Sequence, residues 1–160
     1  MIRRAVEGDG PRIARMHWDS HQSTYVDSGL VERARIEAWT LDQRTEAWER
    51  MVDESLRGDR TVFVAVRVDQ VVGFADARSV DAADAPRGLE LKGLYVLDEY
   101  HGSGVGQSLL DETIGDRPAF VWVLAGETRA RAFYRRNRFE PDGIEAPFES
   151  WGVTAVRLVR

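Results

Sequence analysis

The feature that most constrains this chain is the stretch from Leu89 to Leu110, where an apolar segment is followed by a short turn and three closely spaced glycines. Leu94 to Leu97 are apolar and aromatic residues typical of a central strand. Gly102, Gly104 and Gly106 then occupy alternate positions, and the next residues begin a helical pattern. Glycine allows positive φ and the close approach of a ligand to the backbone. The sequence therefore predicts a strand, a glycine-rich loop and a helix in direct succession.

This loop is suited to binding phosphate groups. Successive amides in such a turn form a concave anion site, and the N-terminus of the following helix adds its dipole. A Walker loop needs a second glycine five residues after the first, followed by lysine, but Gln107 stands five residues after Gly102 and no lysine follows it. The dinucleotide fingerprint G-x-G-x-x-G is also absent, because the spacing here is G-x-G-x-G. The alternative is a glycine-rich turn without a ligand, which would leave an entropy cost of roughly 1 kcal/mol per glycine without compensation.

The composition indicates one globular domain that spans residues 1–160, and it excludes several kinds of function. No apolar run approaches the ~20 residues that cross a bilayer, and the first residues lack the apolar core of a signal peptide. Without cysteine there is no disulfide, thiolate nucleophile or cysteine-ligated metal. A net charge of −5 gives no footprint for nucleic acid. We expect a cytoplasmic protein with no nucleic-acid or membrane partner. Lys92 is the one lysine, which indicates a GC-rich bacterial genome.

The first sixty residues predict a short strand and two helical regions. The strand spans Ile2 to Val6. The first helical region begins near Pro11 and ends near Gly29, and the second runs from Val31 to Arg57. Thr40 or Asp42 is suited to cap its main helix, and Gly58 to end it. Tryptophan and aliphatic residues at helical spacing in this region favour core packing.

His17 and His21 are four residues apart in the first helical region, so they share one helix face. That spacing would allow metal ligation. No third ligand is evident, so a pair of packed or exposed histidines is the simpler interpretation. We therefore expect no metal site.

The remaining strands follow from apolar runs between turn residues. Thr61 to Val66 and Val71 to Ala77 predict a hairpin through a tight turn. Ala119 to Leu124 is a further buried strand, and Trp151 to Arg160 a closing strand whose partner is expected near Arg138 to Glu140.

From His101 onward, the loop H-G-S-G-V-G resembles the Q/R-x-x-G-x-G/A signature of the GNAT-type N-acetyltransferases. A later stretch, from Glu127 to Phe139, is similar to that superfamily's second motif, N-x-x-A-x-x-F-Y-x-x-x-G-F. Three positions depart from the two motifs: His101 replaces Gln or Arg, Glu127 replaces Asn, and Arg138 replaces Gly. The residues that match the second motif are Ala130, Phe133, Tyr134 and Phe139.

The resemblance implies an α/β fold with a mixed, mostly antiparallel sheet flanked by helices and splayed at its central strand. It also implies transfer of an acetyl group from acetyl-CoA to a primary amine of a small molecule or peptide by direct attack, without a metal. Homodimers are common in this family. The alternative is a non-catalytic acyl-CoA-binding or sensing domain of the same fold. The three departures support that alternative, whereas retention of Glu90 and Tyr134 argues against it.

In the terms of this resemblance, Glu90 is the general base and Tyr134 is the general acid. A tyrosine suits the acid role because its ordinary pKa of about 10 keeps it protonated at neutral pH. Glu90 could instead be a carboxylate that faces solvent or pairs with Lys92. Simple alternation places Glu90, Lys92, Leu94 and Val96 on one strand face, unless a bulge near Leu94 shifts the pattern.

The resemblance further implies that the backbone of the central strand binds the pantetheine arm and that the loop amides bind the pyrophosphate. Acceptor contacts are implied for Trp18, His21 and Tyr25, together with Glu90. The implied coenzyme contacts are Leu94, Tyr95, Val96, His101, Gly102, Ser103, Gly104, Val105, Gly106, Gln107, Glu127, Phe133 and Tyr134.

Overall fold

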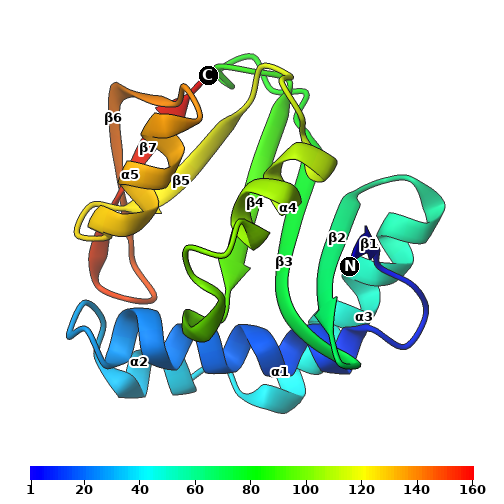
Figure 1. Ribbon diagram of the computed structural model, residues 1–160. Helices are drawn as coiled ribbons and strands as arrows, with labels where there is room; N and C mark the ends of the chain where they lie inside the picture. Colours follow the sequence, from blue (N-terminus) through cyan, green and yellow to red (C-terminus); the bar gives the residue numbers. More distant parts are fainter.

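The apolar runs of the sequence form one seven-stranded sheet in the computed structural model, which describes all of residues 1–160 (Figure 1). Across the sheet the strand order is β1-β2-β3-β4-β5-β7-β6. Only β4 and β5 are parallel; the other neighbours are antiparallel. The expected mixed, mostly antiparallel sheet is confirmed. The strands are β1 (Ile2–Arg4), β2 (Thr61–Arg67), β3 (Gln70–Ser79), β4 (Leu89–Val96), β5 (Phe120–Leu124), β6 (Glu140–Phe148) and β7 (Val153–Val159).

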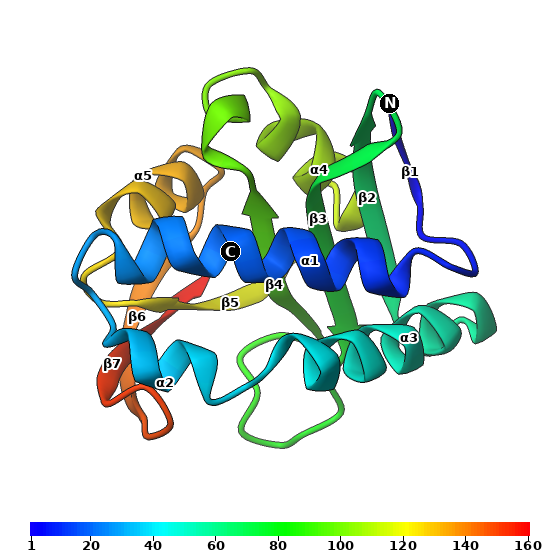
Figure 2. The same ribbon diagram turned by 90° about the horizontal axis from the view of Figure 1, so that it is seen from below.

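Helices cover both faces of this sheet. On one face α1 and α3 lie side by side and pack on β2 and β3, and on the other α4 packs against the sheet (Figure 2). None of the helices is both long and apolar enough to cross a membrane. The helices are α1 (Gly10–His21), the π-helix η1 (Gln22–Val26), α2 (Arg33–Glu37), α3 (Leu41–Arg57), the 3-10 turn η2 (Asp98–Tyr100), α4 (Val105–Thr113) and α5 (Thr128–Arg136).

The helical region expected between Val31 and Arg57 divides into α2 and α3, because Thr40 has an extended backbone. Thr40 begins α3 with a capping box: its Oγ1 accepts from the Gln43 amide at 3.3 Å, and Gln43 Oε1 accepts from the Thr40 amide at 3.0 Å. Gly58 ends the helix in the left-handed conformation. Thr40, and not Asp42, is therefore the cap.

β4 and β5 diverge soon after they meet (Figure 1). They pair only at Glu90 with Phe120 and at Leu91 with Val121. Beyond Leu91, the edge of β4 that faces β5 has no strand partner, so backbone donors and acceptors there are left for another ligand. The expected splay at the central strand is confirmed.

A β-bulge in β4 reverses the alternation of its side chains. The register with β3 shifts between Asp76 and Ala77, which leaves Lys92 as the extra residue. Leu91 before the bulge and Leu94 after it consequently join the same core beneath α4. Of the two alternatives that the sequence left open, the bulge near Leu94 is the one observed, at Lys92. One face is therefore not shared by Glu90, Lys92, Leu94 and Val96.

The turn after α5 holds Arg138 in the left-handed region, with φ of 67°. A side chain in that conformation costs roughly 1 kcal/mol compared with glycine. We expect Arg138→Gly to raise the free energy of unfolding by up to about 1 kcal/mol, which corresponds to a Tm about 2–4 °C higher for a chain of this size. Thermal unfolding followed by circular dichroism measures this difference.

Arg138→Ala is the matched control for that variant. It removes the same exposed ion pair with Asp116 but keeps the Cβ atom that causes the strain. We expect Arg138→Ala to bring no gain in Tm. A glycine variant that melts no higher than the alanine variant would contradict backbone strain at this turn.

Candidate active site

An open cavity of about 710 Å³ lies where β4 and β5 separate. Four parts of the chain that are distant in sequence form its walls. They are the end of α1 with η1 and the residues after it, the last residues of β4, the glycine loop with the start of α4, and the turn after β5 with α5. A cavity of this size suits a small-molecule or cofactor ligand.

The glycine loop presents unpaired backbone amides to this cavity. Gly102 and Gly104 adopt φ of 76° and 85°, which glycine takes without strain. The amides of Gly106 and Gln107, two lining residues in the first turn of α4, have no acceptor in the protein. Together with the helix dipole, these donors favour a bound anion. The loop has the geometry on which the phosphate-site prediction depends.

His101, at the first position of the loop motif, is turned back onto the protein. Its Nε2 lies 2.8 Å from the Val96 carbonyl oxygen, which can only accept, so Nε2 carries the hydrogen. The other ring nitrogen, Nδ1, accepts from the Arg129 guanidinium. The imidazole therefore ties the loop to the end of β4 and to the start of α5.

Tyr134 lines the cavity from α5 and is only 5% exposed. Its ring packs edge-on against Phe133 and Phe139, with centroids 5.3 and 5.5 Å away. Burial, with a smaller contribution from Tyr95, raises the pKa of its phenol well above the ordinary value. No hydrogen bond within the protein contributes to that shift. The hydroxyl is therefore protonated at neutral pH and able to donate.

Two further tyrosines and a carboxylate share the cavity wall. The hydroxyls of Tyr25 and Tyr95 are 3.1 Å apart. Glu127 caps α5 and accepts from the Ala130 amide at 3.4 Å. Burial is the main cause that raises the pKa of both phenols, and the negative charge of Glu127 adds to it. All three side chains therefore belong to one cavity lining.

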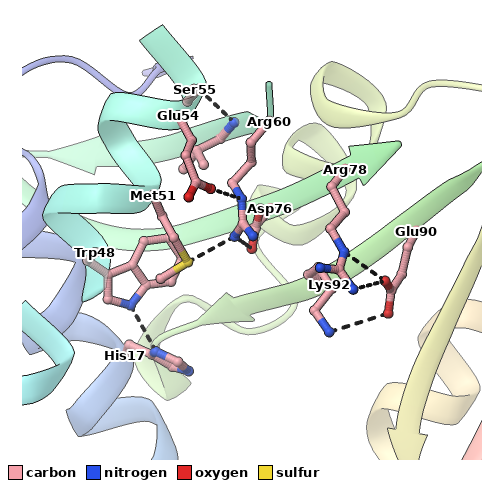
Figure 3. A network of polar contacts seen from close by, with 11 residues as sticks. His17, Trp48, Met51, Glu54, Ser55, Arg60, Asp76, Arg78, Glu90 and Lys92 are labelled. Carbon is pink, nitrogen blue, oxygen red and sulfur yellow. Dashed lines mark hydrogen bonds and ion pairs between the residues drawn. The ribbon is translucent and has the colours of Figure 1, made fainter. Parts of the chain in front are cut away.

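The structure does not bring Glu90 to the cavity lining. Its carboxylate is buried and accepts from Arg78 Nε at 3.0 Å and from Lys92 Nζ at 3.4 Å (Figure 3). Of the interpretations weighed from the sequence, the geometry matches the one in which Glu90 is paired with Lys92. It separates Glu90 from Tyr134, which faces the cavity.

Of the expected acceptor contacts on α1 and η1, only Tyr25 lines the cavity. His21 is buried, and its Nδ1 accepts from Arg44 Nη1 at 3.1 Å, since a guanidinium can only donate. The Trp18 ring lies 5.3 Å from the guanidinium carbon of the same arginine. Burial, followed by the charges of His17 and Arg44, lowers the pKa of His21 well below its usual value. Trp18 and His21 thus pack behind the wall.

The second histidine of the pair is also used inside the protein. His17 Nδ1 accepts from Trp48 Nε1 at 3.1 Å (Figure 3), and burial lowers its pKa to about 3. Both histidines are therefore neutral and hydrogen-bonded to α3. No group of three or more His, Cys, Asp or Glu side chains is placed to hold a metal ion.

Most of the residues expected to contact a coenzyme do line the cavity. Ser103 and Val105 do not: the Ser103 hydroxyl donates to the Tyr100 carbonyl, and Val105 packs in the core. Those that line it are Leu94, Tyr95, Val96, His101, Gly102, Gly104, Gly106, Gln107, Glu127, Phe133 and Tyr134.

Two groups stand out among the lining residues that sequence reasoning missed. One is a set of small hydroxyl side chains along α1, η1 and the following turn, which the run of serine and threonine could have indicated. The other is a pair of arginines on α5, at positions that the second motif leaves variable. These residues are Ser20, Ser23, Thr24, Ser28, Arg129 and Arg136.

Comparison with known proteins adds independent findings. The family model of the acetyltransferase (GNAT) domain matches residues 57–141, more than half of the chain. A Mycobacterium tuberculosis protein named "Probable N-acetyltransferase" is 26% identical over 149 residues, which cover 89% of this chain and 80% of that protein.

Two solved structures show the same fold over the whole chain. The PaiA N-acetyltransferase of Thermoplasma acidophilum, crystallised in complex with coenzyme A, superimposes with a TM-score of 0.79 at 20% identity, and covers 100% of this chain and 98% of its own. A ribosomal-protein-alanine N-acetyltransferase of Brucella melitensis gives 0.71 at 24% identity, with coverage of 100% and 98%.

Proposed function

The chain belongs to the GNAT acetyltransferase family, and from this premise we propose that it transfers an acetyl group from acetyl-CoA to a primary amine of a small molecule or peptide. One observation carries the proposal: the unpaired amides of the glycine loop and the Tyr134 hydroxyl belong to one cavity at the splay of β4 and β5. The fold shared with a relative that was crystallised with coenzyme A supports the same class of ligand.

We assign each end of the coenzyme to a part of the cavity by its chemistry. The pyrophosphate needs several donors and positive charge, which the first turn of α4 and the guanidinium groups of Arg129 and Arg136 provide. The pantetheine arm carries amides, which can pair with the free backbone edge of β4 from Leu94 to Val96. This assignment brings the thioester end of the arm toward Tyr134.

Acetyl-CoA supplies a thioester carbonyl that an uncharged amine can attack. Backbone amides of β4 beyond the bulge are suited to hold the carbonyl oxygen as negative charge develops on it. When the carbon–nitrogen bond forms and the carbon–sulfur bond breaks, Tyr134 donates its phenolic proton to the sulfur. The apolar contacts of its ring with Phe133 and Phe139 hold the phenol in place for that transfer.

Two assays on the purified chain test this proposal. Calorimetric titration with coenzyme A should show micromolar binding, and mixing with acetyl-CoA and primary amines should release free thiol. Binding without thiol release from any amine would identify the alternative, a non-catalytic acyl-CoA-binding domain. No binding by folded protein would contradict both functions.

Gly104→Ala is expected to weaken the binding of coenzyme A by about tenfold or more. Gly104 has a left-handed φ, where a Cβ atom costs roughly 1 kcal/mol. The loop can relieve this strain by changing its backbone conformation, but its amides then no longer point toward the ligand. Calorimetry with coenzyme A measures the change in Kd.

Gly58→Ala is the matched control. Gly58 has a similar φ of 91° and no atom within 4 Å of an added Cβ, but it ends α3 and does not line the cavity. We expect a similar loss of stability with an unchanged Kd for coenzyme A. An unchanged Kd in Gly104→Ala as well would show that the loop is not the phosphate site.

A further inference from the structure

We propose that Glu127 binds the ammonium group of the acceptor and receives its proton, so that the acceptors are primary amines that arrive as cations. This inference rests on the proposed acetyl transfer and names the residue that meets the amine. It assigns to Glu127 the role of general base, which the sequence suggested for Glu90. It also makes Glu127 a contact of the acceptor amine and no longer a contact of the coenzyme.

The first observation is that Glu127 has no cationic partner. Its half-buried carboxylate takes part in none of the ion pairs of the protein, and its one hydrogen bond, from the Ala130 amide, is long at 3.4 Å. The other carboxylate in the cavity lining, Asp98, is 56% exposed, so solvent screens its charge. A partly buried carboxylate without a cation is costly, and a bound ammonium group would offset that cost.

The second observation is that the parts of the lining that come from α1, η1 and the turn after it, and from β4, carry no charged side chain. Tyr25 and Tyr95 present phenols there, and Ser20 lines the same cavity with a buried Oγ that has no hydrogen-bond partner. The turn before Glu127 is covered by Leu30, since a Cβ atom on Gly126 would lie 2.6 Å from Leu30 Cδ2. A cation in this part of the cavity would find its only negative charge on Glu127.

The charges of the cavity also separate the two substrates. Arg129 and Arg136 belong to the lining and suit the phosphates of the coenzyme, whereas a carboxylate repels them. The second family motif has asparagine at the position of Glu127, and an amide cannot accept a proton at neutral pH. The carboxylate of this chain can do so. Glu90, by contrast, is already paired with Arg78 and Lys92 outside the cavity.

The proposed step balances in protons and electrons. The ammonium group gives one proton to Glu127, and the freed lone pair forms the carbon–nitrogen bond as the carbon–sulfur bond breaks. Tyr134 protonates the sulfur, and the second proton lost by the nitrogen restores the phenol. Glu127 then releases its proton to solvent, so each turnover yields an amide, a thiol and one proton.

The binding test is an NMR titration of the coenzyme-A-saturated chain with 1-aminopentane, followed at the backbone amide of Gly126. We expect Glu127→Gln to raise the Kd of 1-aminopentane by about tenfold or more, since a charge-assisted contact is lost. Glu90→Gln, the matched carboxylate control, should leave it unchanged. Equal affinities in wild type and Glu127→Gln, or no binding of 1-aminopentane by wild type, would overturn the inference.

The proton-transfer half is tested by thiol release from acetyl-CoA with the same amine. We expect Glu127→Gln to lower kcat by about 100-fold, Glu127→Asp to recover part of it, and Glu90→Gln to keep it. A kcat lost in Glu90→Gln but kept in Glu127→Gln would return the base role to Glu90. Calorimetry of wild type with coenzyme A distinguishes failure of the proposed function from failure of the Glu127 assignment. If wild type does not bind coenzyme A, the proposed function is refuted. If it binds coenzyme A but the Glu127 variants behave like wild type, only the assignment of Glu127 is refuted.

Discussion

Tyr134→Phe is expected to lower kcat for acetyl transfer about 100- to 1,000-fold while the Kd of coenzyme A stays the same. The variant removes one oxygen atom from a side chain whose ring is already held by Phe133 and Phe139. Because burial raises the pKa of this phenol well above its ordinary value, the phenol keeps its proton at neutral pH and can donate it to the sulfur. Without this phenol, the sulfur must leave as a thiolate or take its proton from water.

The measurement is thiol release at saturating acetyl-CoA and amine, with calorimetry on the same preparations. Tyr100→Phe is the matched control, because it removes a hydroxyl from the same cavity but from η2 at the loop end. We expect its kcat to stay within about twofold of wild type. Equal kcat in Tyr134→Phe and wild type would show that the acid role belongs elsewhere.

The part of the site that could be predicted from the sequence depends on local rules. The glycine loop follows β4 directly, and alternate glycines before a helical pattern have few other physical explanations. Thr40 with Gln43, and Gly58 at the other end of the helix, mark α3 by capping chemistry that needs no tertiary contact. Local patterns therefore predicted where α3 ends and where the glycine loop opens α4, and they limited the start of α3 to Thr40 or Asp42.

The position of Glu90 could not be predicted in the same way. Its face depends on one extra residue, Lys92, in the register between β3 and β4, and that register is set by two strands together. The carboxylate also finds Arg78 on the neighbouring strand, which alternation within β4 does not reveal. Glu90, which the sequence suggested as the general base, is thus paired with Arg78 and Lys92.

The position of His21 could not be predicted either, because it depends on a local change of helix type. His21 and Tyr25 are four residues apart and would share a face of a regular α-helix. The chain instead widens into the π-helix η1, where the Asp27 amide bonds to the Gln22 carbonyl five residues earlier. Tyr25 consequently reaches the cavity, whereas His21 packs against Arg44 of α3.

Asp76→Asn is expected to remove a pH dependence of about 3 kcal/mol from the stability of the protein. Asp76 lies in β3, only 5% exposed, with Oδ2 accepting from Arg60 Nη1 at 2.8 Å and with no partner for Oδ1 (Figure 3). Arg60 is shared with Glu54, at 3.1 Å. Burial outweighs the attraction of Arg60 and raises the pKa of Asp76 to about 6.

The sign follows from proton binding in the two states. Between about pH 4 and pH 6 the native carboxyl holds a proton that the unfolded chain has released, so the free energy of unfolding falls as pH rises. At about 1.4 kcal/mol for each unit of pKa, the loss from Asp76 amounts to about 3 kcal/mol by pH 7. Asparagine does not titrate, so the stability of Asp76→Asn relative to wild type should rise by that amount from pH 4 to pH 7.

Urea unfolding of both proteins at pH 4, 5, 6 and 7 measures this difference directly. Asp9→Asn is the control of opposite sign: burial alone would raise the pKa of Asp9, but hydrogen bonds from Arg3 and the Val6 amide hold it below its usual value. Wild type therefore has this favourable charge throughout the range from pH 4 to pH 7, whereas the variant lacks it. We expect Asp9→Asn to be less stable than wild type by a nearly constant amount over this range, since the usual aspartate pKa is about 4. Parallel curves for wild type and Asp76→Asn would mean that Arg60 keeps the buried carboxylate ionised throughout this range.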